Sequence, residues 1–108
     1  MADDATRSPL VVTPASRLDS ASSPAFEQEL AARVAEGVTR VVLDFSQVAY
    51  ISSAGLRVVL VTGKKLKAAG GTLALAGLKD NCLEVFEISG FVALFPLFGT
   101  VEEALAAG

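Results

Sequence analysis

Short, continuous apolar runs alternate with helical segments along this chain, and that alternation most constrains its fold. Residues 39–45 and 72–76 have the apolar centres Val-Val-Leu and Leu-Ala-Leu, which are typical of strands covered on both faces. Between them, residues 53–69 predict a helix that Gly70 and Gly71 end. We therefore expect an α/β fold, with a mixed, mostly parallel sheet of four to five strands flanked by about four helices.

The remaining elements are shorter. Residues 10–13 form a β-branched run that Pro14 stops, which predicts a strand near an edge of the sheet. Apolar residues at helical spacing, followed by glycine, predict helices over 24–36 and 80–89. A final strand is expected near 94–98, followed by a helix that Thr100 and Glu103 begin as a capping box. Residues 1–9 are interpreted as a flexible N-terminal tail and 10–108 as one domain.

The composition argues against enzymatic chemistry. The chain has no histidine, the commonest general base and a frequent metal ligand. Its one cysteine, Cys82, cannot form an internal disulfide, and its setting predicts a half-buried structural residue on a helix face. We therefore expect a binding protein that is not an enzyme, with no cofactor and no metal.

Charge and hydropathy narrow the choice of partners. The net charge is −3 with nine Lys and Arg, which argues against nucleic acid. Lys64, Lys65 and Lys67 cluster, but in the last turns of a helix cations complement its dipole and face water. The apolar stretch 56–61 is too short to cross a bilayer. The N-terminus does not have the pattern of a signal peptide, so we expect a cytoplasmic protein without direct membrane insertion.

The turn at residues 51–56, Ile-Ser-Ser-Ala-Gly-Leu, is the candidate working surface. In open α/β sheets, functional groups gather where strands end and helices begin, and a helix start tolerates a phosphate. Gly55 costs the helix about 1 kcal/mol relative to alanine unless another backbone approaches it closely. The alternative is that Ser52 and Ser53 merely cap the helix. No phosphate-cradling glycine loop is present, so a nucleotide site is not supported.

A second group of serines lies in the loop at residues 19–24, Asp-Ser-Ala-Ser-Ser-Pro. Ser23 followed by Pro24 is a typical helix start, with proline at the first helical position. We interpret Ser20, Ser22 and Ser23 as residues that cap the helix or face water.

Several motifs in one order connect the chain to a known family. Residues 43–58, Leu-Asp-Phe-Ser-Gln-Val-Ala-Tyr-Ile-Ser-Ser-Ala-Gly-Leu-Arg-Val, closely resemble the signature of STAS domains, especially bacterial anti-sigma-factor antagonists. The resemblance continues through 70–75, 85–91 and 101–105, and covers roughly residues 10–107. It implies a single STAS domain whose function is to switch between protein partners.

The resemblance also implies roles for individual residues. Such antagonists bind an anti-sigma factor, usually a serine kinase, until one serine is phosphorylated; a serine phosphatase then resets them. The phosphorylated serine matches Ser53. Leu18-Asp19 matches a segment near that serine which helps to contact the kinase. The implied partner-binding residues are Asp19, Ser52, Ser53, Ala54, Gly55 and Leu56.

Three departures from the family pattern stand out. Ser52 replaces a common aspartate, which makes it a second candidate phosphorylation site, and Ala54 replaces Ser or Thr. About nine residues precede Leu10, so we expect the family's first strand to be shortened or absent and residues 10–13 to be more exposed. Two alternatives within the family stay open: a STAS subunit that docks on the ATPase of a membrane transport complex, and a nucleotide-binding module, which the acidic balance disfavours.

Overall fold

The computed structural model describes residues 9–107, and it contains four α-helices and six short strands within them. In chain order the elements are β1 (Leu10–Val12), β2 (Arg17–Leu18), α2 (Ser23–Ala35), β3 (Arg40–Asp44), β4 (Tyr50–Ile51), α3 (Ser53–Ala68), β5 (Thr72–Ala76), α4 (Asp80–Ser89), a 3₁₀ turn (Phe91–Ala93), β6 (Leu97–Phe98) and α5 (Val101–Ala107). The prediction of a tail at 1–9 falls, apart from Pro9, outside the described residues.

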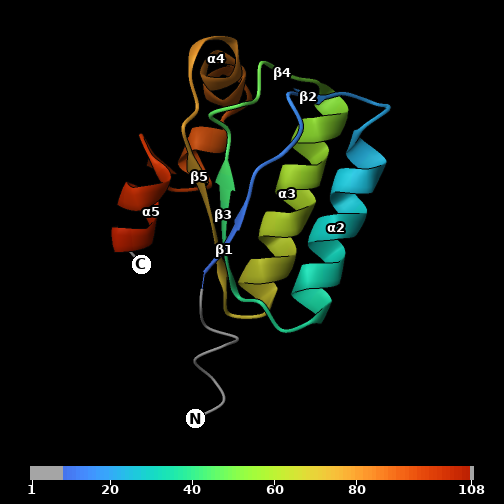
Figure 1. Ribbon diagram of the computed structural model, residues 1–108, viewed down its shortest axis with the longest axis vertical. Helices are drawn as coiled ribbons and strands as arrows, with labels where there is room; N and C mark the ends of the chain where they lie inside the picture. The colour runs from blue at the N-terminus through green and yellow to red at the C-terminus, as the bar shows by residue number, and fades with distance from the viewer. Residues whose placement is uncertain (1–8, 108) are drawn as a thin grey trace.

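Four strands form the main sheet in the order β1-β3-β5-β6, and every pairing is parallel. Val42 on the central strand β3 lies between Val11 of β1 and Ala74 of β5. β2 and β4 form a separate parallel pair at the end of the molecule where β3 points and where α2 and α3 begin (Figure 1). The expected α/β fold is confirmed, and β1 is an edge strand as predicted.

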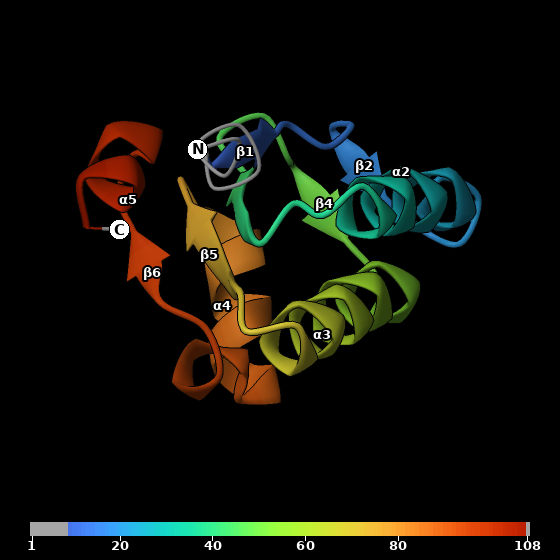
Figure 2. The same cartoon turned by 90° about the horizontal axis from the view of Figure 1, so that it is seen from below.

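The two faces of the sheet are covered unequally. Helices α2 and α3 lie on one side and α5 on the other, as the view along the sheet shows (Figure 2). Val41 and Leu43 belong to the larger core with buried residues of α2, α3 and α4. Val42 and Ala76 point the opposite way and pack with Ala104 of α5 in a smaller cluster. This alternation explains the continuous apolar centre of β3, which is buried on both faces.

Most element boundaries lie within one residue of the sequence expectations. The observed bounds of β5 and α4 are those predicted, and Gly90 takes the left-handed conformation expected after α4. Helix α2 begins one residue early, at Ser23, so Pro24 is its second residue. The last strand is shorter than the predicted 94–98, because the chain first makes the 3₁₀ turn and Pro96 precedes β6. The short strands β2 and β4, which pair with each other, were not predicted.

Two side-chain predictions need correction. Cys82 is fully buried rather than half-buried, at 2% exposure, and burial raises the pKa of its thiol. Thr100 does accept a hydrogen bond from the Glu103 amide, at 3.1 Å. The Glu103 carboxylate, however, accepts from Gly99 N at 3.0 Å, one residue before the position a capping box requires. Lys64, Lys65 and Lys67 are exposed as expected, and no helix within residues 9–107 is long and apolar enough to span a membrane.

Candidate functional site

The predicted turn lies where the small β2–β4 pair meets the first turn of α3 (Figure 1). Leu18 pairs with Ile51, and the Leu18 carbonyl accepts a hydrogen bond from Ser52 N at 2.8 Å. Ala49 N donates to the Ser16 carbonyl at 2.7 Å on the other side of the pair. These bonds fix the chain on both sides of Ile51, so α3 starts at a defined place beside the Leu18-Asp19 segment.

The two adjacent serines have different structural positions. Ser52 has an extended backbone and is the N-cap of α3: its hydroxyl accepts from Gly55 N at 3.4 Å and donates to the Leu18 carbonyl at 3.1 Å. Ser53 is the first residue of the helix and is exposed. The capping alternative therefore describes Ser52, whereas Ser53 presents its hydroxyl to solvent at the positive end of the helix dipole.

Gly55 is buried and faces the interior of the protein rather than solvent. A Cβ at this position would lie 2.9 Å from the Leu18 carbonyl oxygen and 2.8 Å from Ile51 Cγ1. The backbone whose close approach the glycine permits is therefore that of β2 in the same chain. Gly55 positions the turn, and its neighbours Ala54 and Leu56 are half-buried at the surface.

Asp19 organises the loop that leads from β2 into α2. Its Oδ1 accepts hydrogen bonds from Ala21 N (3.1 Å) and Ser22 N (3.0 Å) and lies 3.2 Å from the Ser22 hydroxyl oxygen. The backbone hydrogen bond from Ser22 is the main reason why the pKa of Asp19 lies below its ordinary value. Arg17 Nε lies 3.6 Å from Asp19 Oδ2 and adds to this effect.

The serines of this loop only partly follow the expectation. Ser20 is exposed, and Ser22 precedes α2, but its hydroxyl donates to the Arg17 carbonyl at 2.7 Å instead of capping the helix. Ser23 neither caps nor faces water, contrary to the prediction. It is 3% exposed, and its hydroxyl has no hydrogen-bond partner within residues 9–107. The helix starts one residue earlier than expected, which turns Ser23 inward.

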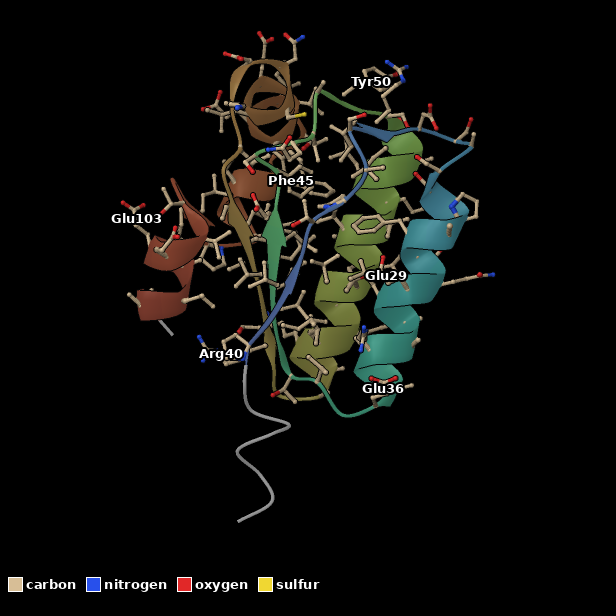
Figure 3. The ribbon with its side chains drawn as sticks, in the orientation of Figure 1. Glu29, Glu36, Arg40, Phe45, Tyr50 and Glu103 are labelled. Atoms are coloured by element: carbon tan, nitrogen blue, oxygen red, sulfur yellow. The ribbon has the colours of Figure 1, made fainter. Side chains whose placement is uncertain are left out.

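Two residues of this surface were missed by the sequence analysis. Tyr50 on β4 is 42% exposed and projects from the end of the molecule (Figure 3). The Arg17 guanidinium lies 4.6 Å from the centre of its ring. Tyr50 lies three residues before Ser53, in the segment that resembles the family signature, so its position could have marked it as a surface residue. Its contact with Arg17 could not be predicted, because it depends on the pairing of β2 with β4.

The exposed and half-buried side chains around the turn come from β2, β4, the loop before α2 and the first turn of α3. No group of three or more His, Cys, Asp or Glu in the described part of the chain could hold a metal ion. The exposed and half-buried residues of the site form what we call the docking face: Arg17, Asp19, Tyr50, Ser53, Ala54 and Leu56. Ser53 lies on this face as the exposed first residue of α3.

Comparisons with known proteins agree on the family. The family model of the STAS domain matches residues 2–104. A curated relative, the candidate anti-sigma factor antagonist BtrV of Bordetella bronchiseptica, is 51% identical over 90 residues, which are 83% of this chain and 78% of BtrV.

Solved structures share the fold. An anti-sigma factor antagonist from Mycobacterium paratuberculosis has a TM-score of 0.85 at 28% identity, covering 93% of this chain and 85% of that one. The Bacillus cell fate determinant SpoIIAA, in its phosphorylated form, has a TM-score of 0.76 at 23% identity, covering 94% and 92%. At that identity the second likeness is evidence for the fold alone.

Proposed function

This chain belongs to the STAS domain family, and it is homologous to anti-sigma factor antagonists of that family. We propose that it is a partner switch controlled by phosphorylation. In its unphosphorylated form it binds an anti-sigma factor that is also a serine kinase. Phosphorylation of Ser53 releases it, and a serine phosphatase restores the binding form. The chain is then a ligand and a substrate, not a catalyst.

The observation that supports the proposal is that the two adjacent serines have different positions in the structure. The Ser52 hydroxyl is engaged with Gly55 N and the Leu18 carbonyl, while Ser53 is exposed on the docking face. A kinase can reach Ser53 without breaking the start of the helix, whereas modification of Ser52 would remove the N-cap. This supports Ser53 as the acceptor and argues against Ser52.

Release follows from charge and volume. A phosphate on Ser53 adds about −1.5 to −2 charge at neutral pH, in the middle of a surface that must lie against the partner. The half-buried Ala54 and Leu56 flank that point, so a partner that packs on them has no room for the group. The phosphate itself is tolerated by the protein, because it stands at the N-terminus of α3.

Asp19 contributes to the proposed kinase contact through its loop. Its carboxylate holds the Ala21 and Ser22 amides and so fixes the loop beside the docking face. We propose Asp19, Ser52, Ser53, Ala54, Gly55 and Leu56 as the partner-binding segment, with Gly55 and Ser52 acting by shaping the turn.

The test is phosphorylation by the anti-sigma factor kinase of the same switching system. Wild type, Ser53→Ala and Ser52→Ala proteins are incubated with that kinase and ATP, and their intact masses are measured. We expect one phosphate on wild type and on Ser52→Ala, and none on Ser53→Ala. A phosphate retained on Ser53→Ala would refute the assignment of Ser53. No phosphate on wild type, with co-purification of a transporter ATPase, would replace the switch with the transport-complex alternative.

A further inference from the structure

An arginine on α3 lies one helical turn beyond the proposed phosphorylation site and is paired with a residue of α2. Arg57 follows Ser53 by four positions, and its Nη1 lies 3.6 Å from Glu27 Oε1. The Arg57 side chain is 67% exposed and that of Glu27 is 32% exposed. Neither residue has a role in the proposed function as stated so far.

The helix geometry brings Arg57 to the phosphate. Residues four apart share one face of an α-helix, with about 5–6 Å between their Cβ atoms. Helical side chains also lean toward the N-terminus, so a long side chain at position 57 extends over the turn that contains Ser53. A phosphate on Ser53 would therefore stand within reach of the Arg57 guanidinium.

We propose that Arg57 binds the phosphate on Ser53 and that its ion pair with Glu27 breaks when it does so. This inference rests on the proposed function. An exposed ion pair such as Arg57–Glu27 contributes little. A phosphate has three acceptor oxygens and up to two negative charges, which a guanidinium can bind through two hydrogen bonds. The exchange frees the Glu27 carboxylate on α2, so phosphorylation changes the charge presented by a second helix as well as by α3.

Arg17 is a second arginine near the site, and its contacts explain why we infer that Arg57 binds the phosphate instead. Arg17 on β2 and Asp19 in the loop that follows it lie at this end of the molecule, together with the neutral Tyr50 on β4 and with Glu27 on α2. Arg17 already lies over the Tyr50 ring and 3.6 Å from Asp19 Oδ2, whereas among residues 9–107 Arg57 has one ion pair, with Glu27. Moving Arg57 breaks one exposed contact, and moving Arg17 breaks two.

The test uses protein in which phosphoserine is installed at position 53 during translation, so no kinase is needed. The second pKa of the phosphate, ordinarily about 6, is measured by ³¹P NMR in low salt. A nearby cation favours the dianion and lowers this pKa. We expect Arg57→Gln to raise it by about 0.15–0.4 pH unit, which corresponds to about 0.2–0.5 kcal/mol for a pair of charges four residues apart on a helix, and Glu27→Gln to lower it. In the Arg57→Gln background, Glu27→Gln should have a smaller effect.

Matched variants separate a local contact from a change in net charge. Arg33→Gln removes the same charge from an exposed pair with Glu36 at the other end of α2, and we expect it to leave the phosphate pKa unchanged. A second readout is the ¹⁵N shift of Arg57 Nε, which should change on phosphorylation. Circular dichroism verifies that each variant is folded.

Equal phosphate pKa values in wild type and Arg57→Gln would overturn the inference. A rise in Arg17→Gln but not in Arg57→Gln would also overturn it, because β2 would then hold the phosphate. Failure here is distinguishable from failure of the proposed function. A kinase that ignores Ser53 refutes the switch but leaves these titrations valid, whereas flat titrations refute only the role of Arg57.

Discussion

Two neighbouring hydroxyls in the Ser52-Ser53 turn serve different purposes, and the difference can be measured as stability. Ser52 Oγ joins the first turn of α3 to the Leu18 carbonyl, while Ser53 extends into solvent. The resemblance to the family signature predicts Ser53 as the phosphate acceptor. It could not predict that Ser52 ties α3 to β2, because that bond spans residues far apart in the chain.

Ser52→Ala should lower the free energy of unfolding by about 1 kcal/mol, the usual cost of losing an N-cap. Ser53→Ala should change it by less than about 0.5 kcal/mol, because the side chain is exposed. Urea unfolding followed by circular dichroism gives both values. Equal stabilities of the two variants would contradict the assignment of the cap to Ser52.

At the scale of elements, the small β2–β4 pair sets the geometry of the docking face. Each strand has only two residues, and nothing in their local sequence has the length or alternation that predicts a strand. Their pairing depends on α2 and α3 packing side by side, which local pattern cannot reveal. By contrast, β3 and β5 were predicted because burial on both faces requires a continuous apolar centre.

Gly55→Ala tests the contact between α3 and β2. Alanine is the better helix former by about 1 kcal/mol, but its Cβ would lie 2.9 Å from both Cβ and the carbonyl oxygen of Leu18. We expect a net loss of about 1–3 kcal/mol in urea unfolding. The exposed Lys64→Ala on the same helix is the control, with a change within about 0.5 kcal/mol. A Gly55→Ala protein as stable as wild type would show that the contact is not tight.

The loop between β2 and α2 should be sensitive to acid through Asp19. Its pKa is lowered in the folded protein, chiefly by the hydrogen bond from Ser22 N. The ionised carboxylate therefore stabilises the fold above its unfolded pKa of about 3.9, and this is lost as pH falls through the folded pKa. Asp19→Asn should be less stable than wild type at pH 7, and the difference in the free energy of unfolding should disappear as the pH falls through the folded pKa of Asp19. A gap that does not change with pH would disprove this role.

At the scale of the whole molecule, a row of three packed phenylalanine rings connects the end of β3 to α4 and to the 3₁₀ turn that follows it. Phe86 is fully buried, with ring centres 5.5 Å from Phe45 and 5.7 Å from Phe91. The apolar spacing of residues 80–89 predicted the helix that carries Phe86. Cys82 was expected to be half-buried, but it lies one turn before Phe86 on the same face of α4, and both side chains are buried.

Phe86→Ala should destabilise the protein by about 3–5 kcal/mol, as expected for a large residue removed from a tight core. Ile88→Ala on the same helix should change stability by less than about 0.5 kcal/mol, because Ile88 is 79% exposed. Urea unfolding is followed by circular dichroism and by the fluorescence of Tyr50, the only tyrosine in a chain without tryptophan. Similar losses for both variants would contradict the core described here.

The central claim, that phosphate on Ser53 controls docking, is tested most directly by calorimetry with the purified anti-sigma factor kinase in the absence of ATP. Wild type and Ser53→Ala should bind with similar Kd. Protein carrying phosphoserine at position 53 should bind at least about tenfold more weakly, a difference of about 1.4 kcal/mol. Equal affinity of the phosphorylated and unphosphorylated proteins would contradict the account.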